Sequence, residues 1–171
     1  PLTEAAVVQA NMEVAQQVEP VNRVVKEQLM QAEVAHFDES GIRVSKQLNW
    51  MHVASTPRLT YYAIHHKRGF DAMNAIGILP EFRGTAVHDS MKSYLRYTEA
   101  SHGLCNSHHL RELRFVTERY GQAWASDMAI LLLEIKKAVD ESKDQNQLYL
   151  AEKRIREFEE RYDALVTQGL Q

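Results

Sequence analysis

The sequence contains little cysteine and no long apolar run, and each absence excludes a class of protein. Cys105 is the only cysteine among the 171 residues, so no disulfide can form within the chain, which suits a reducing cytosol. The longest uninterrupted apolar run, Met128 to Leu133, is too short to cross a membrane. The first residues lack the charged and apolar regions of a signal peptide. We therefore expect a cytoplasmic protein without a membrane partner.

The sequence also has fewer basic than acidic residues, with 20 Lys and Arg against 23 Asp and Glu. The net charge of −3 argues against a general nucleic-acid-binding protein. The charge is unevenly distributed, however: residues 57–120 contain nine Lys and Arg against six Asp and Glu, whereas residues 121–171 contain seven against ten. The middle of the chain is therefore the part that we expect to face DNA.

Helical patterns occupy both ends of the chain. Residues 1–32 place valine and alanine at helical spacing, and Pro20 is expected to end one helix and to open a second. Residues 121–171 contain two apolar stripes separated by a polar break at 142–146, which predicts an antiparallel helical hairpin. We expect the first segment to be a helical lead-in and the second to be a helical insertion.

Residues 33–120 change to a strand pattern and form the predicted core. A short apolar run ends at Asp38, Gly41 is expected to form a turn, and strands are expected at 48–53 and 59–65. These strands follow one another too closely for parallel crossovers, so an antiparallel meander is expected. The rest of the core is predicted as a helix at 70–76 closed by Gly77, a strand at 84–88, a helix at 90–97, a strand at 101–106 and a helix at 108–120.

Two aspartates follow apolar strands and are the candidate catalytic residues. Asp38 and Asp89 are expected at the carboxyl ends of their strands, and neighbouring strands would bring the two carboxylates to the same edge of the sheet. Carboxylate oxygens are the ligands that Mg²⁺ takes, and two such ions can assist phosphodiester displacement. The alternative is structural, because an aspartate before a glycine turn or at a helix start is common.

Histidine and cysteine offer weaker candidates. Cys105 and His108 have a zinc-like spacing but lack a second pair of ligands, which favours structural packing. His88 should face away from Asp89 on its strand and is expected to pack in the core, whereas His36 shares a face with Asp38.

Several blocks of residues, in order, resemble the central domain of insertion-sequence sixty-six (IS66) family transposases. The resemblance extends from about Pro20 to about Leu170. The blocks are His36–Gly41, Trp50–Thr56, Arg58–Tyr62, Lys67–Gly69, Gly77–Pro80, Val87–Asp89 and Cys105–Leu113.

The resemblance implies an α/β fold of the ribonuclease H-like type, with a mixed sheet of three antiparallel strands followed by parallel additions. It also implies a metal-dependent transposase with an Asp, Asp, Glu triad, Mg²⁺ or Mn²⁺ as cofactor, and DNA as partner. Asp38 would be the first acid and Asp89 the second. The third acid of the family belongs to a later Asn-Asn-x-x-Glu-Arg block, which is absent here. The core at 33–120 is therefore expected to be incomplete, and the chain is expected to be an inactive fragment. Within this chain, Glu112 is the best substitute for the missing third acid.

The sequence also offers basic residues that could contact DNA phosphates, and it leaves two alternative functions open. Basic residues that could contact the DNA backbone are Arg58, Lys67, Arg68, Arg83 and Arg111. One alternative is a non-catalytic DNA-interaction or dimerising module, a homo-oligomer joined through the stripe at 148–165. The other is a metal-dependent nuclease, which would need Glu112 as the third acid.

Overall fold

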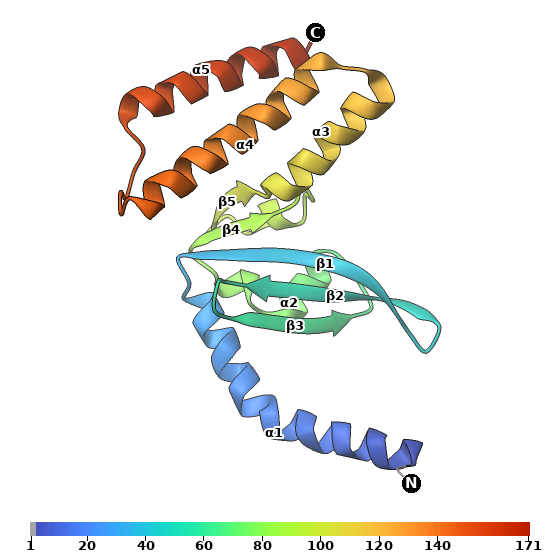
Figure 1. The fold of residues 1–171 in the computed structure, drawn as a ribbon. Helices are drawn as coiled ribbons and strands as arrows, with labels where there is room; N and C mark the ends of the chain where they lie inside the picture. The colour runs from blue at the N-terminus through green and yellow to red at the C-terminus, as the bar shows by residue number, and fades with distance from the viewer. Residues whose placement is uncertain (1–2) are drawn as a thin grey trace. The chain divides into compact units, whose positions relative to one another are not determined.

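The computed structural model describes residues 3–171, which divide into two compact units, the first ending at Leu104 and the second beginning at Cys105 (Figure 1). The first unit contains a five-stranded sheet and the second contains three helices. The predicted mixed α/β class is confirmed. The predicted division at 32/33 and 120/121 stays a prediction.

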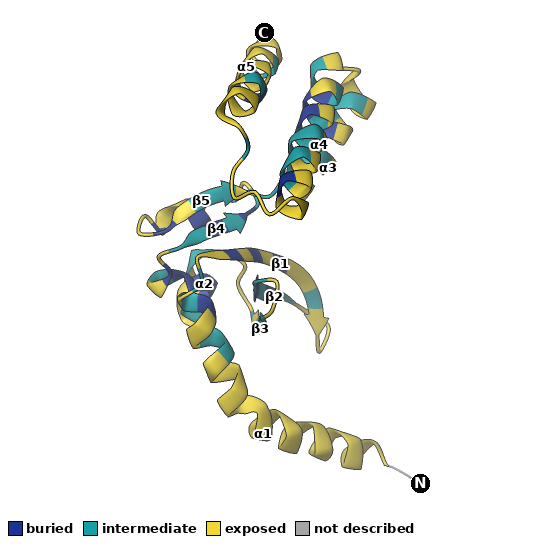
Figure 2. Cartoon of the chain, turned by 60° about the vertical axis from the view of Figure 1, so that its left-hand side comes forward, coloured by how far each residue is buried: buried dark blue, intermediate teal, exposed yellow. Residues whose placement is uncertain are grey.

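The N-terminal segment is one helix, α1 (Glu4–Met30), so the predicted break at Pro20 is wrong. Thr3 caps the helix by accepting a hydrogen bond from the Ala6 amide at 3.2 Å. Proline has no amide proton and removes one helical hydrogen bond, which a helix can accommodate by bending. Figure 1 shows α1 bent but continuous. Residues 3–24 are exposed on every side, and Leu29 anchors the other end in the core (Figure 2).

Three antiparallel strands follow, as predicted: β1 (Val34–Val44), β2 (Gln47–Ser55) and β3 (Thr60–His65). The turn expected at Gly41 is wrong, because β1 continues through that glycine. The chain reverses instead at Ser45 and Lys46, whose φ angles of 50° and 68° form a two-residue hairpin turn. Neither residue is a glycine or an asparagine, so the sequence did not indicate this turn. The long strand also places Asp38 inside β1, and the prediction that Asp38 ends its strand is wrong.

Two parallel strands complete the sheet in the order β3-β2-β1-β4-β5. These are β4 (Thr85–His88) beside β1 and β5 (Ser101–Leu104) beside β4. Gly84 makes this arrangement possible, because a Cβ at that position would lie 2.3 Å from the Ala32 carbonyl oxygen. The close approach lets the Thr85 amide donate to the Glu33 carbonyl at 2.8 Å. Only glycine allows β4 to start this near β1.

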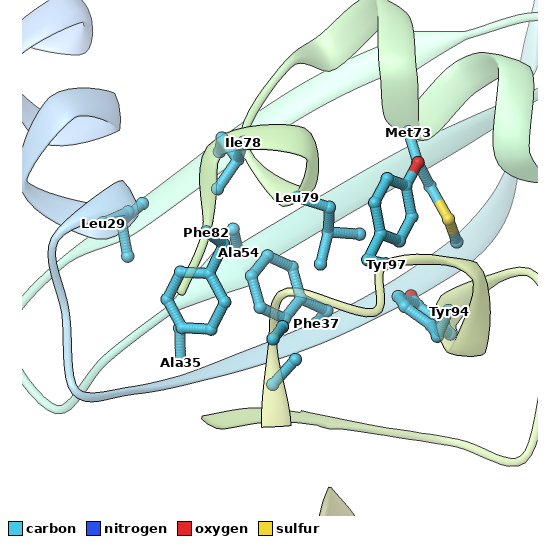
Figure 3. Close-up of a cluster of buried hydrophobic side chains, with 12 residues drawn as sticks. Leu29, Ala35, Phe37, Ala54, Met73, Ile78, Leu79, Phe82, Tyr94 and Tyr97 are labelled. Atoms are coloured by element: carbon cyan, nitrogen blue, oxygen red, sulfur yellow. The ribbon is translucent and has the colours of Figure 1, made fainter. Parts of the chain in front are cut away.

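The remaining elements of the first unit cover one face of the sheet. α2 (Phe70–Ile76) ends at Gly77, whose φ of 72° is left-handed, as predicted. A 3-10 turn, η1 (Leu79–Glu81), follows it. The helix predicted at 90–97 is wrong, since only the 3-10 turn η2 (Tyr94–Arg96) forms there. Figure 3 shows the shared core, which comprises Leu29, Ala35, Phe37, Ala54, Met73, Ile78, Leu79, Phe82, Ala86, Tyr94, Tyr97 and Ala100.

The second unit consists of α3 (Asn106–Tyr120), α4 (Ala123–Asp144) and α5 (Glu152–Gly169). The predicted C-terminal pair of helices is confirmed, but the break between them lies at 145–151, because Ser142 is still helical and buried. The core of the unit consists of Leu113, Ala125, Met128, Leu131 and Phe158. No helix within residues 3–171 combines the length and the apolar character needed to cross a membrane.

Candidate acid site on two neighbouring parallel strands

The two candidate acids follow the paired part of β1 and β4. The last paired positions of this parallel pair are His36 and Val87. Two residues further along the chain are Asp38, which lies within β1, and Asp89, which follows the end of β4. Neighbouring parallel strands therefore lead to both aspartates that the sequence singled out, although Asp89 is not itself paired with Asp38.

Each aspartate also accepts a local hydrogen bond. Asp38 Oδ1 accepts from the Glu39 amide at 2.9 Å, and Asp89 Oδ1 accepts from the Met91 amide at 2.9 Å. The second contact is the turn that a structural aspartate makes, as the alternative interpretation predicted. These bonds fix one oxygen of each carboxylate and so restrain the orientation of both side chains.

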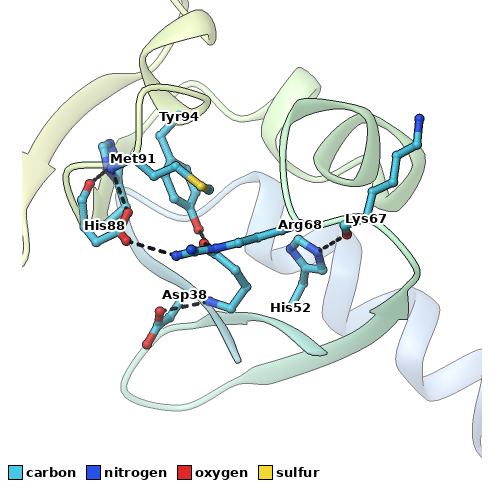
Figure 4. A network of polar contacts seen from close by, with 9 residues as sticks. Asp38, His52, Lys67, Arg68, His88, Met91 and Tyr94 are labelled. Carbon is cyan, nitrogen blue, oxygen red and sulfur yellow. Dashed lines mark hydrogen bonds and ion pairs between the residues drawn. The ribbon is translucent and has the colours of Figure 1, made fainter. Parts of the chain in front are cut away.

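A buried carboxylate lies directly beside this pair. The Glu39 side chain is fully buried on the core face of β1, and both of its oxygens are hydrogen-bonded. Oε1 accepts from Arg68 Nε at 2.8 Å, and Oε2 accepts from the Tyr94 hydroxyl at 2.5 Å. Burial and the neighbouring Glu39 carboxylate raise the pKa of Tyr94 well above its usual value, so this phenol stays protonated and donates. Figure 4 shows these contacts.

Arg68 connects the buried glutamate to the candidate acid on β4. Its Nη2 lies 3.6 Å from Asp89 Oδ2, while its Nε is bound to Glu39. Its guanidinium carbon lies 5.0 Å from the centroid of the Trp50 ring, within the range of a cation–π contact. The hydrogen bond to Glu39 raises the pKa of Arg68, so the guanidinium is a permanent cation of the site.

Two histidines support the end of β4 from the core side. His88 is buried, as predicted, and its ring stacks on Tyr94 at 4.3 Å. His88 Nε2 lies 2.9 Å from His102 Nδ1, and His102 Nε2 lies 3.2 Å from the Tyr97 carbonyl oxygen. Burial lowers the pKa of His88, which keeps the ring neutral at pH 7. This packing holds the backbone that leads into Asp89.

The predicted phosphate-contacting residues of the first unit differ in their surroundings. Arg58, Lys67 and Arg83 are exposed. Lys67 pairs with Asp71 at 2.7 Å, and Arg83 Nη1 donates to the Pro80 and Phe82 carbonyls at 3.0 and 3.1 Å. Only Arg68 is directed into the acid site, where it binds carboxylates.

Other predicted residues lie on α3 or elsewhere on the sheet. Glu112 and Arg111 are exposed on α3, which belongs to the second unit. His36 is exposed on the face of β1 that also presents Asp38, as predicted. Burial raises the pKa of the Cys105 thiol, but hydrogen bonds with His108 outweigh this and lower it overall. Residues 3–171 contain no group of three or more His, Cys, Asp or Glu able to hold a metal ion.

Comparison with known proteins decides the family. A family model described as "Transposase IS66 family" matches residues 1–171, the whole chain. The chain belongs to the IS66 transposase family.

The other comparisons are weaker. No match was found among curated proteins. One solved structure with some likeness is the intasome of simian T-cell lymphotropic virus in complex with the PP2A regulatory subunit B56 gamma. The identity is 10% and the TM-score is 0.35, over 57% of this chain and 46% of that one, so the match spans less than half of that chain.

Sequence reasoning missed Glu39 and Tyr94 in this IS66-family chain. A signal for Glu39 was available, since Ala35, Phe37 and Glu39 alternate along β1 and therefore share its buried face. A charged residue in that series predicts a buried partner. No comparable signal identified Tyr94, because its contact with Glu39 joins residues 55 positions apart.

Proposed function

We propose that this chain is part of the metal-dependent catalytic core of an IS66-family DNA transposase, with a ribonuclease H-like arrangement and two of the three acids of its triad. Asp38 and Asp89 are its metal-binding acids. The observation that carries the proposal is the parallel pairing of β1 with β4, because Asp38 on β1 and Asp89 just after β4 each follow the last paired positions, His36 and Val87, by two residues. The sheet order, with three antiparallel strands extended by two parallel ones, supports the same arrangement.

The donor set fits a hard divalent cation such as Mg²⁺ or Mn²⁺. Such ions prefer carboxylate oxygens and keep several water ligands, so two carboxylates can serve as a partial site. When bound, the metal would supply activation of the attacking oxygen and stabilisation of the leaving one in phosphodiester hydrolysis and strand transfer.

The protein's own residues would perform positioning and charge neutralisation. Asp38 and Asp89 are oriented by amide hydrogen bonds, so little reorganisation is needed when a cation arrives. Arg58, Lys67 and Arg83 are exposed cations of the same unit and would neutralise DNA phosphates. The alternative of a dimerising module through 148–165 has less support, because Phe158 and Leu165 of that stripe pack within the second unit.

The test is to soak crystals of the chain in Mn²⁺ and to locate the ion by anomalous scattering. We expect a peak between Asp38 and Asp89 that disappears in Asp89→Asn. The matched control is Asp71→Asn, an exposed aspartate of the same unit, which should leave the peak unchanged. A chain that binds Mn²⁺ only elsewhere, or equally well without Asp89, would refute the proposed site.

A further inference from the structure

Arg68 sits between two carboxylates that belong to different strands. It reaches Glu39 on β1 through Nε at 2.8 Å and Asp89 after β4 through Nη2 at 3.6 Å. Glu39 is also bound by Tyr94, while Asp89 is partly open to solvent, with 18% of its side chain exposed. The two contacts of Arg68 are therefore unequal, one short and buried and the other longer and solvent-accessible.

The difference between the two contacts of Arg68 determines which one a competing ligand can break. Breaking the Arg68–Glu39 bond would leave a buried carboxylate without its cation, which is strongly unfavourable. Breaking the Arg68–Asp89 contact is less unfavourable, because this contact is longer, both side chains reach solvent in part, and Arg68 keeps its bond to Glu39. A competitor for Asp89 would thus displace Nη2 and leave Nε in place.

We propose that Arg68 is the resident counter-ion of the acid site and competes with the divalent metal for Asp89. This inference rests on the proposed function, because it assumes that Asp89 is a metal-binding acid. In the free protein the guanidinium neutralises Asp89, and a divalent cation must take over its Oδ2 from Nη2. Since both are positive, the bound metal and the retained guanidinium repel each other, and Arg68 lowers the metal affinity of the site.

The experiment measures Mn²⁺ affinity by electron paramagnetic resonance, which counts the free ion and needs no DNA or turnover. We expect Arg68→Gln to bind Mn²⁺ about tenfold more tightly than the wild-type chain, because a nearby positive charge is removed. Arg68→Lys keeps the charge and should stay close to the wild type. Arg58→Gln is the matched control, an exposed arginine of the same unit, and it should change the affinity little.

A second variant guards against misfolding. Arg68→Gln alone leaves the buried Glu39 carboxylate without its cation, which could unfold the chain. The double variant Glu39→Gln, Arg68→Gln removes both charges. The Tyr94 hydroxyl can still donate to the amide oxygen of the new glutamine side chain. The double variant should bind Mn²⁺ more tightly than the single variant Glu39→Gln, since these two differ only in the charge of Arg68. Circular dichroism melting should confirm that it folds.

The outcomes separate the inference from the proposed function. If the wild-type chain binds Mn²⁺ through Asp89 but Arg68→Gln binds it equally or less tightly, the counter-ion role is overturned and the metal site stands. Binding by Arg68→Gln but not by the wild type or Arg68→Lys would support the inference in its strongest form. If no variant binds Mn²⁺, both the inference and the proposed metal site are refuted.

Discussion

The two units of the chain place their charged groups in opposite ways. In the sheet unit, Glu39 is fully buried and its partners come from distant parts of the sequence. In the helical unit, every ion pair that the structure gives is exposed, and most join residues three or four positions apart on one helix, as in the Lys136–Asp140 pair. Local exposed pairs stabilise a helix slightly, whereas a buried charge is costly unless it is fully paired. The comparison indicates that the sheet unit carries a buried, fully paired charge beside the proposed acid site, whereas the ion pairs of the helical unit lie on its surface.

The largest expected effects come from the two apolar cores. Phe82 and Leu131 are both fully buried, one in each unit. We expect Phe82→Ala to lower the unfolding free energy of the sheet unit by about 3–5 kcal/mol, and Leu131→Ala that of the helical unit by about 2–5 kcal/mol. Native-state hydrogen exchange of β1 and α4 amides measures each effect separately. Equal loosening of both units by either variant would show that they unfold as one and would weaken the comparison.

The next effect tests the buried charge directly. Glu39→Gln removes the charge that pairs with Arg68 but keeps an oxygen for the Tyr94 hydroxyl. We expect the free energy of unfolding to fall by about 2–3 kcal/mol. This is less than for an ion pair with both partners buried, because 44% of the Arg68 side chain is exposed. Urea unfolding monitored by the tryptophans measures it. A loss near zero would mean that the buried network contributes nothing to stability.

A smaller effect concerns pH. Burial lowers the pKa of His88 in the folded chain from its usual value of 6.5. Below pH 6.5 the unfolded state therefore binds a proton that the folded state does not, and stability falls until the pH reaches the folded pKa. We expect the melting temperature to drop between pH 7 and pH 5, and His88→Phe to reduce that drop. The same drop in the variant would assign the pH dependence to other groups.

The smallest effect lies on the helical unit. Glu134 pairs with Arg161 at 2.6 Å, with 42% and 47% of the two side chains exposed. Glu134→Gln should lower the unfolding free energy far less than Glu39→Gln does, because solvent screens this pair. Measured beside Glu39→Gln under the same conditions, it completes the comparison. If Glu134→Gln lowered the unfolding free energy as much as Glu39→Gln, the buried and exposed ion pairs would contribute equally and the two units would not differ in this respect.

Local patterns determined much of this fold. The spacing of apolar residues predicted α2, α3, the C-terminal helices and the five strands, because each element depends on residues near one another in the chain. Gly77 ended α2 as expected, since only a left-handed residue fits there. The sequence also singled out Asp38 and Asp89, and the resemblance to IS66-family transposases gave them a role.

Tertiary structure decided the rest. The position of Asp38 inside β1 depends on a hairpin turn at Ser45 and Lys46, whose left-handed conformation is stabilised by strand pairing and not by residue type. The parallel pairing of β1 with β4, which leads to Asp38 and Asp89, depends on how closely Gly84 lets β4 approach β1. The Glu39–Arg68–Asp89 link joins residues that are distant in sequence, and no local pattern encodes such a contact. Charge compensation inside a fold is a property of which strands become neighbours, and only the assembled sheet determines that.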